Sequence, residues 1–369
     1  GREYEVEIRL SSAGGEHLRH RLASKIAVRF PHDFPLMITS REENYLSYSL
    51  GRVRLGGPYL AEYGKDVILE ANGRFGPRWR IRLGPNRVGY LHERYVDELP
   101  EGSPRPRYFL TNVSASPSDS ADVIYIPRPE PVPYSVHPDP DGGRILIRLY
   151  GVQTASTWLS HRAGLRYVDR ITWRQADPET YELAVNLTTP AIWGYDVAVE
   201  GGSLVMSLPY GPDLSEADEQ QPLRGLAVAI EAGHGGGNTG AIGLSGLLER
   251  DVNLATALVL GDLCRTAGAE VYQLREARHG VAYLAIRDSV AARGADVFLS
   301  VHANAAGGGF LRASGTSTYY HNPFWKPLAA RIYDRLLEME FGEFGVVGSF
   351  NYRPIRMSSR PAALVEQAF

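Results

Sequence analysis

Two histidines and two glutamates in the last third of the chain have the residue types of a catalytic metal site. His234 follows the apolar run Leu226 to Ile230 and enters a run of glycines, and His302 ends a second apolar run. Glu249 lies between them at the start of an expected helix, and Glu366 closes a third apolar run. Two imidazoles and one carboxylate are the protein ligands of one class of catalytic zinc site, which keeps a fourth position for water. The second carboxylate would then supply a base.

The sequence around these residues predicts an α/β unit with a mainly parallel, twisted sheet covered by helices. From Leu223 onward, apolar runs of strand length alternate with amphipathic helical patterns. We expect strands at residues 226–231, 270–274, 296–303, 316–320 and 362–365, and helices at 251–267, 281–292 and 324–339. Ligands of open parallel sheets gather beyond the carboxyl ends of the strands, so the four side chains should converge there.

The first 211 residues have a different pattern, with short alternating segments separated by turn residues, which predicts N-terminal all-β modules. A β region is expected over 1–100, including a small barrel over about 36–100, while the role of residues 1–35 stays open. The remaining expected units are a linker at 101–120, a β-sandwich at 121–211, a second linker at 212–222, and a catalytic domain at 223–369.

Length and composition indicate a globular protein of several domains. A chain of 369 residues is too long for one typical core. Its 44% apolar and 22% charged residues are ordinary values for a folded protein. The net charge of −3 argues against nucleic acid as the main partner, and no apolar run approaches the length of a membrane span. Cys264 is the only cysteine, which excludes an intrachain disulfide.

Each candidate residue also has a structural interpretation. A histidine after a strand is, taken alone, more often a satisfied core residue, and acids at a helix start are favoured by the helix dipole. The glycines after His234 resemble a phosphate loop, but the Gly-Lys-Ser/Thr signature is missing. The four residues taken together favour a metal site.

Six motifs in this part of the chain occur in the order found in zinc-dependent N-acetylmuramoyl-L-alanine amidases of the Amidase_3 type, which residues 223–369 resemble. The motifs are Glu231–Gly236, Leu248–Leu254, Ile286-Arg287, Ser300–Ala305, Gly315-Thr316 and Pro361–Glu366. The resemblance implies one zinc ion per catalytic domain, bound by His234, Glu249 and His302, with Glu366 as the catalytic acid and base.

Three further residues are candidates for supporting the site or binding substrate. Asn304 and Arg287 match family positions. Asn304 is expected to brace the loop after His302, and Arg287 to pair with a carboxylate beneath the site; both roles are structural and not catalytic. Arg356 precedes the last strand and is a candidate ligand for a substrate carboxylate, although an isolated arginine is more often a surface charge.

The resemblance implies a peptidoglycan hydrolase that cleaves the amide between N-acetylmuramic acid and the L-alanine of the stem peptide. Two alternatives stay open, namely a zinc peptidase of other specificity and a non-catalytic peptidoglycan-binding protein on an amidase scaffold. The expected partners are peptidoglycan and wall or divisome proteins that bind the β domains. We expect a periplasmic or extracellular, wall-associated protein; the sequence begins with Gly1 and shows no signal peptide.

The β modules carry weaker resemblances to wall-binding domains. Residues 36–100 resemble a small Src-homology-like barrel of bacterial wall proteins, through Trp79–Leu83, Gly89–Leu91 and Tyr95-Val96. Residues 121–211 resemble the AMIN type of wall-targeting sandwich. That likeness rests on Leu149–Gly151, Trp173–Gln175 and Gly194–Asp196.

The chain departs from the amidase pattern at several positions. Glu231 stands where Asp is usual, and Gln367-Ala368 replaces the usual Thr/Met-Gly. Family members usually continue beyond the position of Phe369 with a final helix. Some carry a helix after the second histidine that plugs the site. Residues 306–314 are too few for such a helix and include no acid, so we expect an open site.

Overall fold

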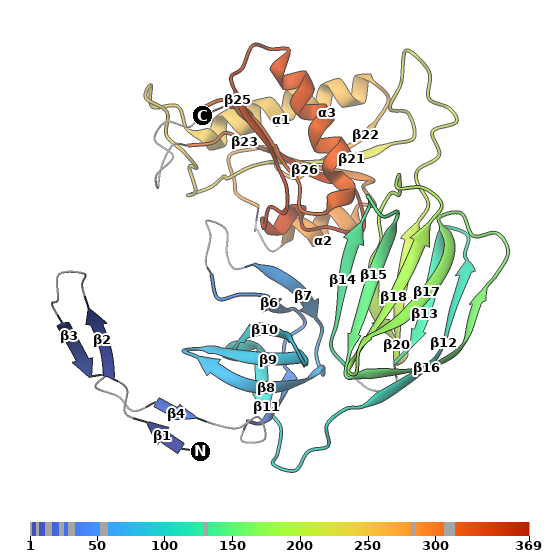
Figure 1. Ribbon diagram of the computed structural model, residues 1–369. Helices are drawn as coiled ribbons and strands as arrows, with labels where there is room; N and C mark the ends of the chain where they lie inside the picture. Colours follow the sequence, from blue (N-terminus) through green and yellow to red (C-terminus); the bar gives the residue numbers. More distant parts are fainter. Residues whose placement is uncertain are drawn as a thin grey trace.

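The computed structural model describes residues 2–4, 7–11, 17–21, 26–28, 34–51, 58–128, 132–281, 285–305 and 314–368 (Figure 1). Two short antiparallel pairs precede residue 34. Strand β1 (Arg2–Tyr4) pairs with β4 (Ile26–Val28), and β2 (Glu7–Ser11) pairs with β3 (His17–Arg21). In the described part of the chain, no helix is both long enough and apolar enough to cross a bilayer.

The first large unit is a seven-stranded antiparallel sheet with the order β11-β5-β8-β9-β10-β6-β7. Alternating residues such as Leu69 and Ile81 are fully buried, which is the pattern of strands with one face in a core. Its strands are β5 (Leu36–Thr39), β6 (Asn44–Ser47), β7 (Tyr59–Tyr63), β8 (Ile68–Phe75), β9 (Arg78–Gly84), β10 (Arg87–His92) and β11 (Val96–Glu98), with a 3₁₀ turn η2 (Glu93–Tyr95). The closed barrel expected for residues 36–100 stays a prediction.

The second unit consists of a five-stranded sheet, β16-β12-β13-β20-β19, and a four-stranded sheet, β14-β15-β18-β17. Buried residues of both sheets, such as Ile124 and Ile147, belong to one hydrophobic cluster. The strands are β12 (Tyr108–Pro117), β13 (Ala121–Pro127), β14 (Tyr134–Asp139), β15 (Arg144–Tyr150), β16 (Val152–His161), β17 (Val168–Asp177), β18 (Thr180–Leu187), β19 (Asp196–Glu200) and β20 (Ser203–Pro209).

The linker predicted over 101–120 is wrong for half of its length, because Tyr108–Pro117 forms strand β12. Leu110, Val113 and Ala115 are fully buried in this strand. They anchor β12 between β13 and β16, so their burial outweighs the Pro- and Ser-rich composition. The predicted linker at 212–222 contains no helix or strand.

The third unit is a six-stranded sheet with the order β22-β21-β23-β26-β24-β25. The first four strands run parallel to one another, while β24 is antiparallel to β26 and parallel to β25. The strands are β21 (Ala227–Ala232), β22 (Glu270–Gln273), β23 (Val297–His302), β24 (Thr316–Tyr319), β25 (Glu343–Val347) and β26 (Ala362–Glu366). The carboxyl ends of β21, β23 and β26 therefore lie side by side, as the sequence predicts for its candidate residues.

Helices pack against both halves of this sheet. Helix α1 (Glu249–Thr266) contacts β21, β22 and β23, and α3 (Lys326–Leu337) contacts β24, β25 and β26. The remaining elements are α2 (Ala285–Ala292), η3 (Pro323–Trp325) and η4 (Arg353–Ile355). Helix α1 begins two residues before the predicted start, which places Glu249 in its first turn. Strand β25 and turn η4 were not predicted.

Candidate metal centre

His234 is placed by an unusual backbone conformation directly after strand β21. Its φ angle is 65°, a left-handed value that side-chain-bearing residues adopt rarely and often at functional sites. The preceding Gly233 allows His302 to approach, because a Cβ at position 233 would lie 2.3 Å from His302 Cε1. The glycine-rich sequence around His234 therefore brings the two histidines together.

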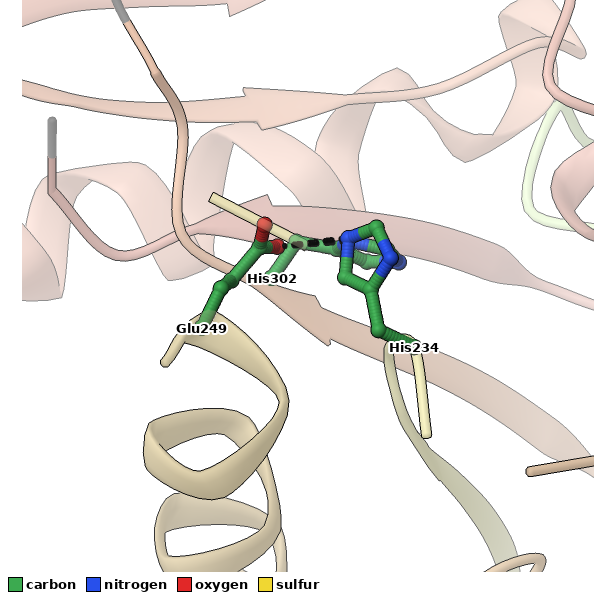
Figure 2. Close-up of side chains that lie close together, drawn as sticks. All are labelled: His234, Glu249 and His302. Carbon is green, nitrogen blue, oxygen red and sulfur yellow. Dashed lines mark hydrogen bonds and ion pairs between the residues drawn. The ribbon is translucent and has the colours of Figure 1, made fainter. Parts of the chain in front are cut away.

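His234, Glu249 and His302 form one cluster beyond the strand ends (Figure 2). One candidate ligand atom from each residue lies within 4.8 Å of the others. Glu249 Oε1 is 2.9 Å from His234 Nε2 and 3.1 Å from His302 Nδ1. The two rings meet edge to face, with centroids 4.9 Å apart. The three residues come from a loop, a helix start and a strand end, and the fold brings them to one point.

The charge on Glu249 is stabilised despite its burial. Burial acts to raise the pKa of this carboxyl, but hydrogen bonds from His234, His302 and the Ala241 amide outweigh burial and lower the pKa well below its usual value. Burial acts to lower the pKa of His302, and the hydrogen bond to Glu249 outweighs it, so that this pKa is raised. The cluster thus places a carboxylate anion beside two histidine rings.

The donor set fits a zinc ion. His302 is 7% exposed, and its Nε2 atom is buried without a hydrogen-bond partner among the described residues. A buried polar atom that lacks a partner is rare in proteins and is often explained by a missing ion or water. Two imidazoles and a carboxylate are ligands that zinc prefers, and their number leaves a coordination position open.

Glu366 ends strand β26 beside His302. The two residues are register partners in the parallel pairing of β23 with β26. The backbone carbonyl of Glu366 accepts a hydrogen bond from Thr316 Oγ1 at 3.2 Å, which fixes the strand end to β24. Register partners on neighbouring strands project to the same face of a sheet, so the Glu366 carboxylate and the His302 imidazole share one side.

Arg275 and Asn253 support the cluster but were not assigned roles from the sequence. Arg275 is 1% exposed and donates hydrogen bonds to the carbonyls of Ala232 and Gly233, which flank His234 on its N-terminal side. Asn253 Nδ2 lies 3.2 Å from Glu249 Oε1. Asn253 lies one helical turn after Glu249, and this spacing of four residues is the signal that could have identified it.

The two departures from the family pattern both take part in hydrogen bonds near the cluster. Gln367 accepts a hydrogen bond from Thr256 Oγ1 at 2.8 Å, and its Nε2 donates to the carbonyl of His302 at 3.2 Å. Glu231 is 5% exposed and accepts a hydrogen bond from Ser300 Oγ at 2.6 Å. These side chains connect β26 to α1 and β21 to β23, so both departures serve the scaffold of the site.

The three supporting candidates lie in different surroundings. Asn304 is 6% exposed, and its amide nitrogen donates to the hydroxyl of Tyr319 at 3.3 Å. Arg287 pairs with Glu62 of strand β7, with the two atoms 3.5 Å apart. The Arg356 guanidinium stacks on rings of the seven-stranded sheet. Of the three, only Asn304 therefore adjoins the cluster, while the two arginines contact the seven-stranded sheet.

A cavity of ≈ 1270 Å³ lies where the three units meet, and the cluster residues and Glu366 are not part of its wall. Its wall includes Tyr59 of β7, Tyr134 of β14 and Arg356. We assign the candidate catalytic site to the cluster of His234, Glu249 and His302 and not to this cavity, because a large cavity volume does not by itself provide metal ligands. The loop expected to leave the site open, residues 306–314, lies outside the described residues except for its last position.

Comparison with protein families gives one match over this unit. The family described as N-acetylmuramoyl-L-alanine amidase (Amidase_3) matches residues 228–369. The Bacillus subtilis protein YqiI, described as uncharacterized, is 34% identical over 161 residues, which are 42% of this chain and 74% of YqiI. The amidase LytC of the same organism is 30% identical over 157 residues, covering 41% of this chain and 30% of LytC.

Two further comparisons each cover 39% of this chain. A sporulation-specific N-acetylmuramoyl-L-alanine amidase of Bacillus subtilis is 31% identical over 151 residues, covering 39% of this chain and 56% of that protein. The solved structure of the amidase AmiC2 of Nostoc punctiforme is 29% identical, with a TM-score of 0.37 over 39% of this chain and 79% of that chain. The matched part thus spans about a third to a half of the two named Bacillus amidases.

Proposed function

The chain belongs to the N-acetylmuramoyl-L-alanine amidase family, and from this premise we propose that it is a peptidoglycan hydrolase. Its substrate is the amide bond between N-acetylmuramic acid and the L-alanine of the stem peptide. The observation that carries this proposal is the convergence of His234, Glu249 and His302 inside the matched region. The buried His302 Nε2 atom, which has no hydrogen-bond partner among the described residues, supports a role in binding an ion.

His234, Glu249 and His302 are the residues that would hold zinc. When bound, zinc supplies Lewis acidity, which polarises an amide carbonyl and lowers the pKa of water to about 7. Glu249 contributes the negative charge of the set and holds both imidazoles through its Oε1 atom. Asn253 and the amide of Ala303 donate to the same oxygen and fix its orientation.

Glu366 is the proposed general base and acid. Its carboxylate accepts a proton from the attacking water and then gives that proton to the nitrogen of the leaving L-alanine. Atoms balance in this scheme, because the water oxygen ends in the lactyl carboxylate and its protons end on the amine and in solvent. The position of Glu366 in register with His302 supports this role, since both side chains project to one face of the sheet.

The β units are proposed to bind the cell wall. An AMIN-like sandwich and a Src-homology-like barrel would hold the catalytic unit near polymeric peptidoglycan and would offer surfaces to wall or divisome proteins. Exposed aromatic side chains on the sandwich support a binding role, with Trp158 69% exposed and Phe109 57% exposed on neighbouring strands. The proposed location is periplasmic or extracellular, where the substrate lies.

Digestion of purified sacculi tests the proposal and separates it from both alternatives. The zinc-loaded protein should release stem peptides with a free L-alanine amino group, identified by mass spectrometry. A zinc peptidase of other specificity would leave L-alanine attached to muramic acid. A non-catalytic binding protein would sediment with sacculi and release nothing. The Glu366→Gln variant, which keeps the metal ligands, is the matched inactive control.

A further inference from the structure

The connection between β25 and β26, residues 348–361, passes the metal cluster on its way to Glu366. Tyr352 lies in this connection, and its ring meets the His302 ring edge to face, with centroids 5.8 Å apart and an interplanar angle of 85°. The only regular element in the connection is the three-residue turn η4. Within its own unit the connection is held by the buried side chains of Ile355 and Met357 and by a hydrogen bond from Trp325 Nε1 to the Met357 carbonyl at 2.9 Å. The two β units add further contacts to it.

The seven-stranded sheet contacts the connection through Glu43 and through strand β6, which begins at the next residue. Arg353 forms an ion pair with Glu43, and the side chain of Arg353 is 13% exposed. Glu43 also accepts a hydrogen bond from the hydroxyl of Tyr45 at 2.6 Å. The ion pair is therefore held in a fixed geometry, which is the condition under which a partly buried pair contributes most.

A cation–π contact strengthens the same junction. The Arg356 guanidinium carbon lies 4.9 Å from the ring centroid of Tyr45 and 4.9 Å from that of Tyr59. Both distances are within the range at which an arginine is attracted to an aromatic face. Tyr59 also meets the ring of His321 edge to face, with centroids 5.7 Å apart. The positive charge of Arg356 thus interacts with two tyrosines of the seven-stranded sheet.

The sandwich holds the other end of the connection. The backbone amide of Tyr195 donates to the carbonyl of Ser358 at 2.8 Å. Gly194 has a φ of 148°, and a Cβ there would lie 2.3 Å from the carbonyl oxygen of Ser359. The close approach of these two backbones requires a glycine at position 194. The two β units therefore both contact the connection, which is 14 residues from Gly348 to Pro361.

We propose that the seven-stranded sheet positions the catalytic centre of the amidase through this connection. Glu43, Tyr45 and Tyr59 hold η4, and η4 keeps Tyr352 against His302. In this arrangement the seven-stranded sheet contributes to the geometry of the catalytic centre in addition to its proposed role in wall binding. Glu43 and Tyr59 are positioning residues, because they act through Arg353, Arg356 and Tyr352. The proposal rests on the proposed amidase function only for its kinetic consequence.

A charge-swap series on the zinc-loaded protein of residues 1–369 tests the proposal. Glu43→Arg should lower kcat on a soluble muramoyl peptide by about tenfold or more, because small displacements of a reactive centre have large effects on rate. KM should stay within about twofold. Adding Arg353→Glu to Glu43→Arg restores the ion pair with reversed charges and should recover most of kcat. Glu42→Arg is the matched control, because Glu42 pairs only at the surface with Lys65, and its side chain is 80% exposed.

A second measurement does not depend on activity. Amide hydrogen exchange of residues 351–360 should be faster in Glu43→Arg than in the wild type and should return to the wild-type rate in the double variant. If the wild type proves inactive on muramoyl peptides, the proposed function fails, while the exchange data still test the positioning role.

Wild-type exchange and wild-type kcat in Glu43→Arg would overturn the proposal. If Glu43→Arg does not fold, Tyr59→Leu tests the same junction, since leucine keeps apolar packing but cannot stack on Arg356. A lowered kcat and faster exchange in Tyr59→Leu would support the proposal, and unchanged values of both would overturn it.

Discussion

His302 and Glu366 are register partners at the ends of the neighbouring parallel strands β23 and β26. This pairing places a candidate metal ligand and a candidate base on one face of the sheet, although 64 positions separate them in the sequence. The backbone amide of Gln367 donates to the carbonyl of His302 at 2.9 Å and continues the ladder past both residues. The ladder thereby fixes the relative position of the two side chains.

Replacing a proposed zinc ligand should remove the metal. We expect His302→Ala to bind less than a tenth of the zinc that the wild type binds after dialysis, and to lose measurable turnover, because two ligands hold zinc far more weakly than three. Elemental analysis gives the zinc content. His279→Ala is the control, since His279 is exposed and is not part of the cluster. A fully occupied His302→Ala protein would exclude His302 as a ligand.

Replacing the proposed base should separate zinc binding from catalysis. Glu366→Gln keeps the size of the side chain but cannot accept a proton, so kcat should fall by about a hundredfold or more. Zinc content and melting temperature should match the wild type. Glu343→Gln, on the exposed start of β25, should leave kcat unchanged. Near-normal turnover in Glu366→Gln would transfer the role to another group.

The metal cluster was predictable because its signals are local. Each histidine follows an apolar run, Glu249 begins a helix, and the carboxyl ends of parallel strands meet at one sheet edge. The backbone strain at His234, with a φ of 65°, was not visible in the sequence, although the glycines around it indicated a tight turn.

The junction between the units was not predictable, because its partners are distant in the sequence. Arg287 and Glu62 are 225 positions apart, and Arg353 and Glu43 are 310 apart. Nothing in the local pattern of an arginine tells which unit supplies its counter-charge. The composition of residues 101–120 led to the incorrect prediction of a linker over the whole of this range. Prolines and serines at 100–107 and 114–120 concealed the buried positions Leu110 and Val113 of a ten-residue strand.

The approach of Gly233 to His302 gives a prediction for a small substitution. Gly233→Ala would place a methyl group 2.3 Å from His302 Cε1, so the imidazole must move and the zinc affinity should fall by about tenfold or more. Competition with a fluorescent chelator measures that affinity. Gly237→Ala is the matched control, because a Cβ at 237 meets no atom within 4 Å. Equal zinc affinities of the two variants would show that the ring does not depend on Gly233.

His137, in strand β14, should make the stability of the unit formed by the five-stranded and four-stranded sheets depend on pH. Burial and the charges of Arg148 and Arg87 lower the pKa of His137 from 6.5 to about 4, while Glu182 acts to raise it. The unfolded chain therefore takes up a proton near pH 6.5 that the folded chain takes up only near pH 4. The contribution of the neutral His137 side chain to the free energy of unfolding is therefore fully present above pH 6.5. It is lost progressively as the pH falls from 6.5 to about 4.

The variant His137→Gln isolates this contribution. The urea midpoint of the wild type, followed by tryptophan fluorescence, should fall between pH 7.5 and pH 4.5, and the fall should be smaller in His137→Gln. Glutamine can keep a hydrogen bond to Ser135, whose hydroxyl lies 2.7 Å from His137 Nε2, but it does not titrate. His279→Gln, at an exposed position, should follow the wild type. Parallel curves for wild type and His137→Gln would mean that His137 is protonated equally in both states and does not couple pH to folding.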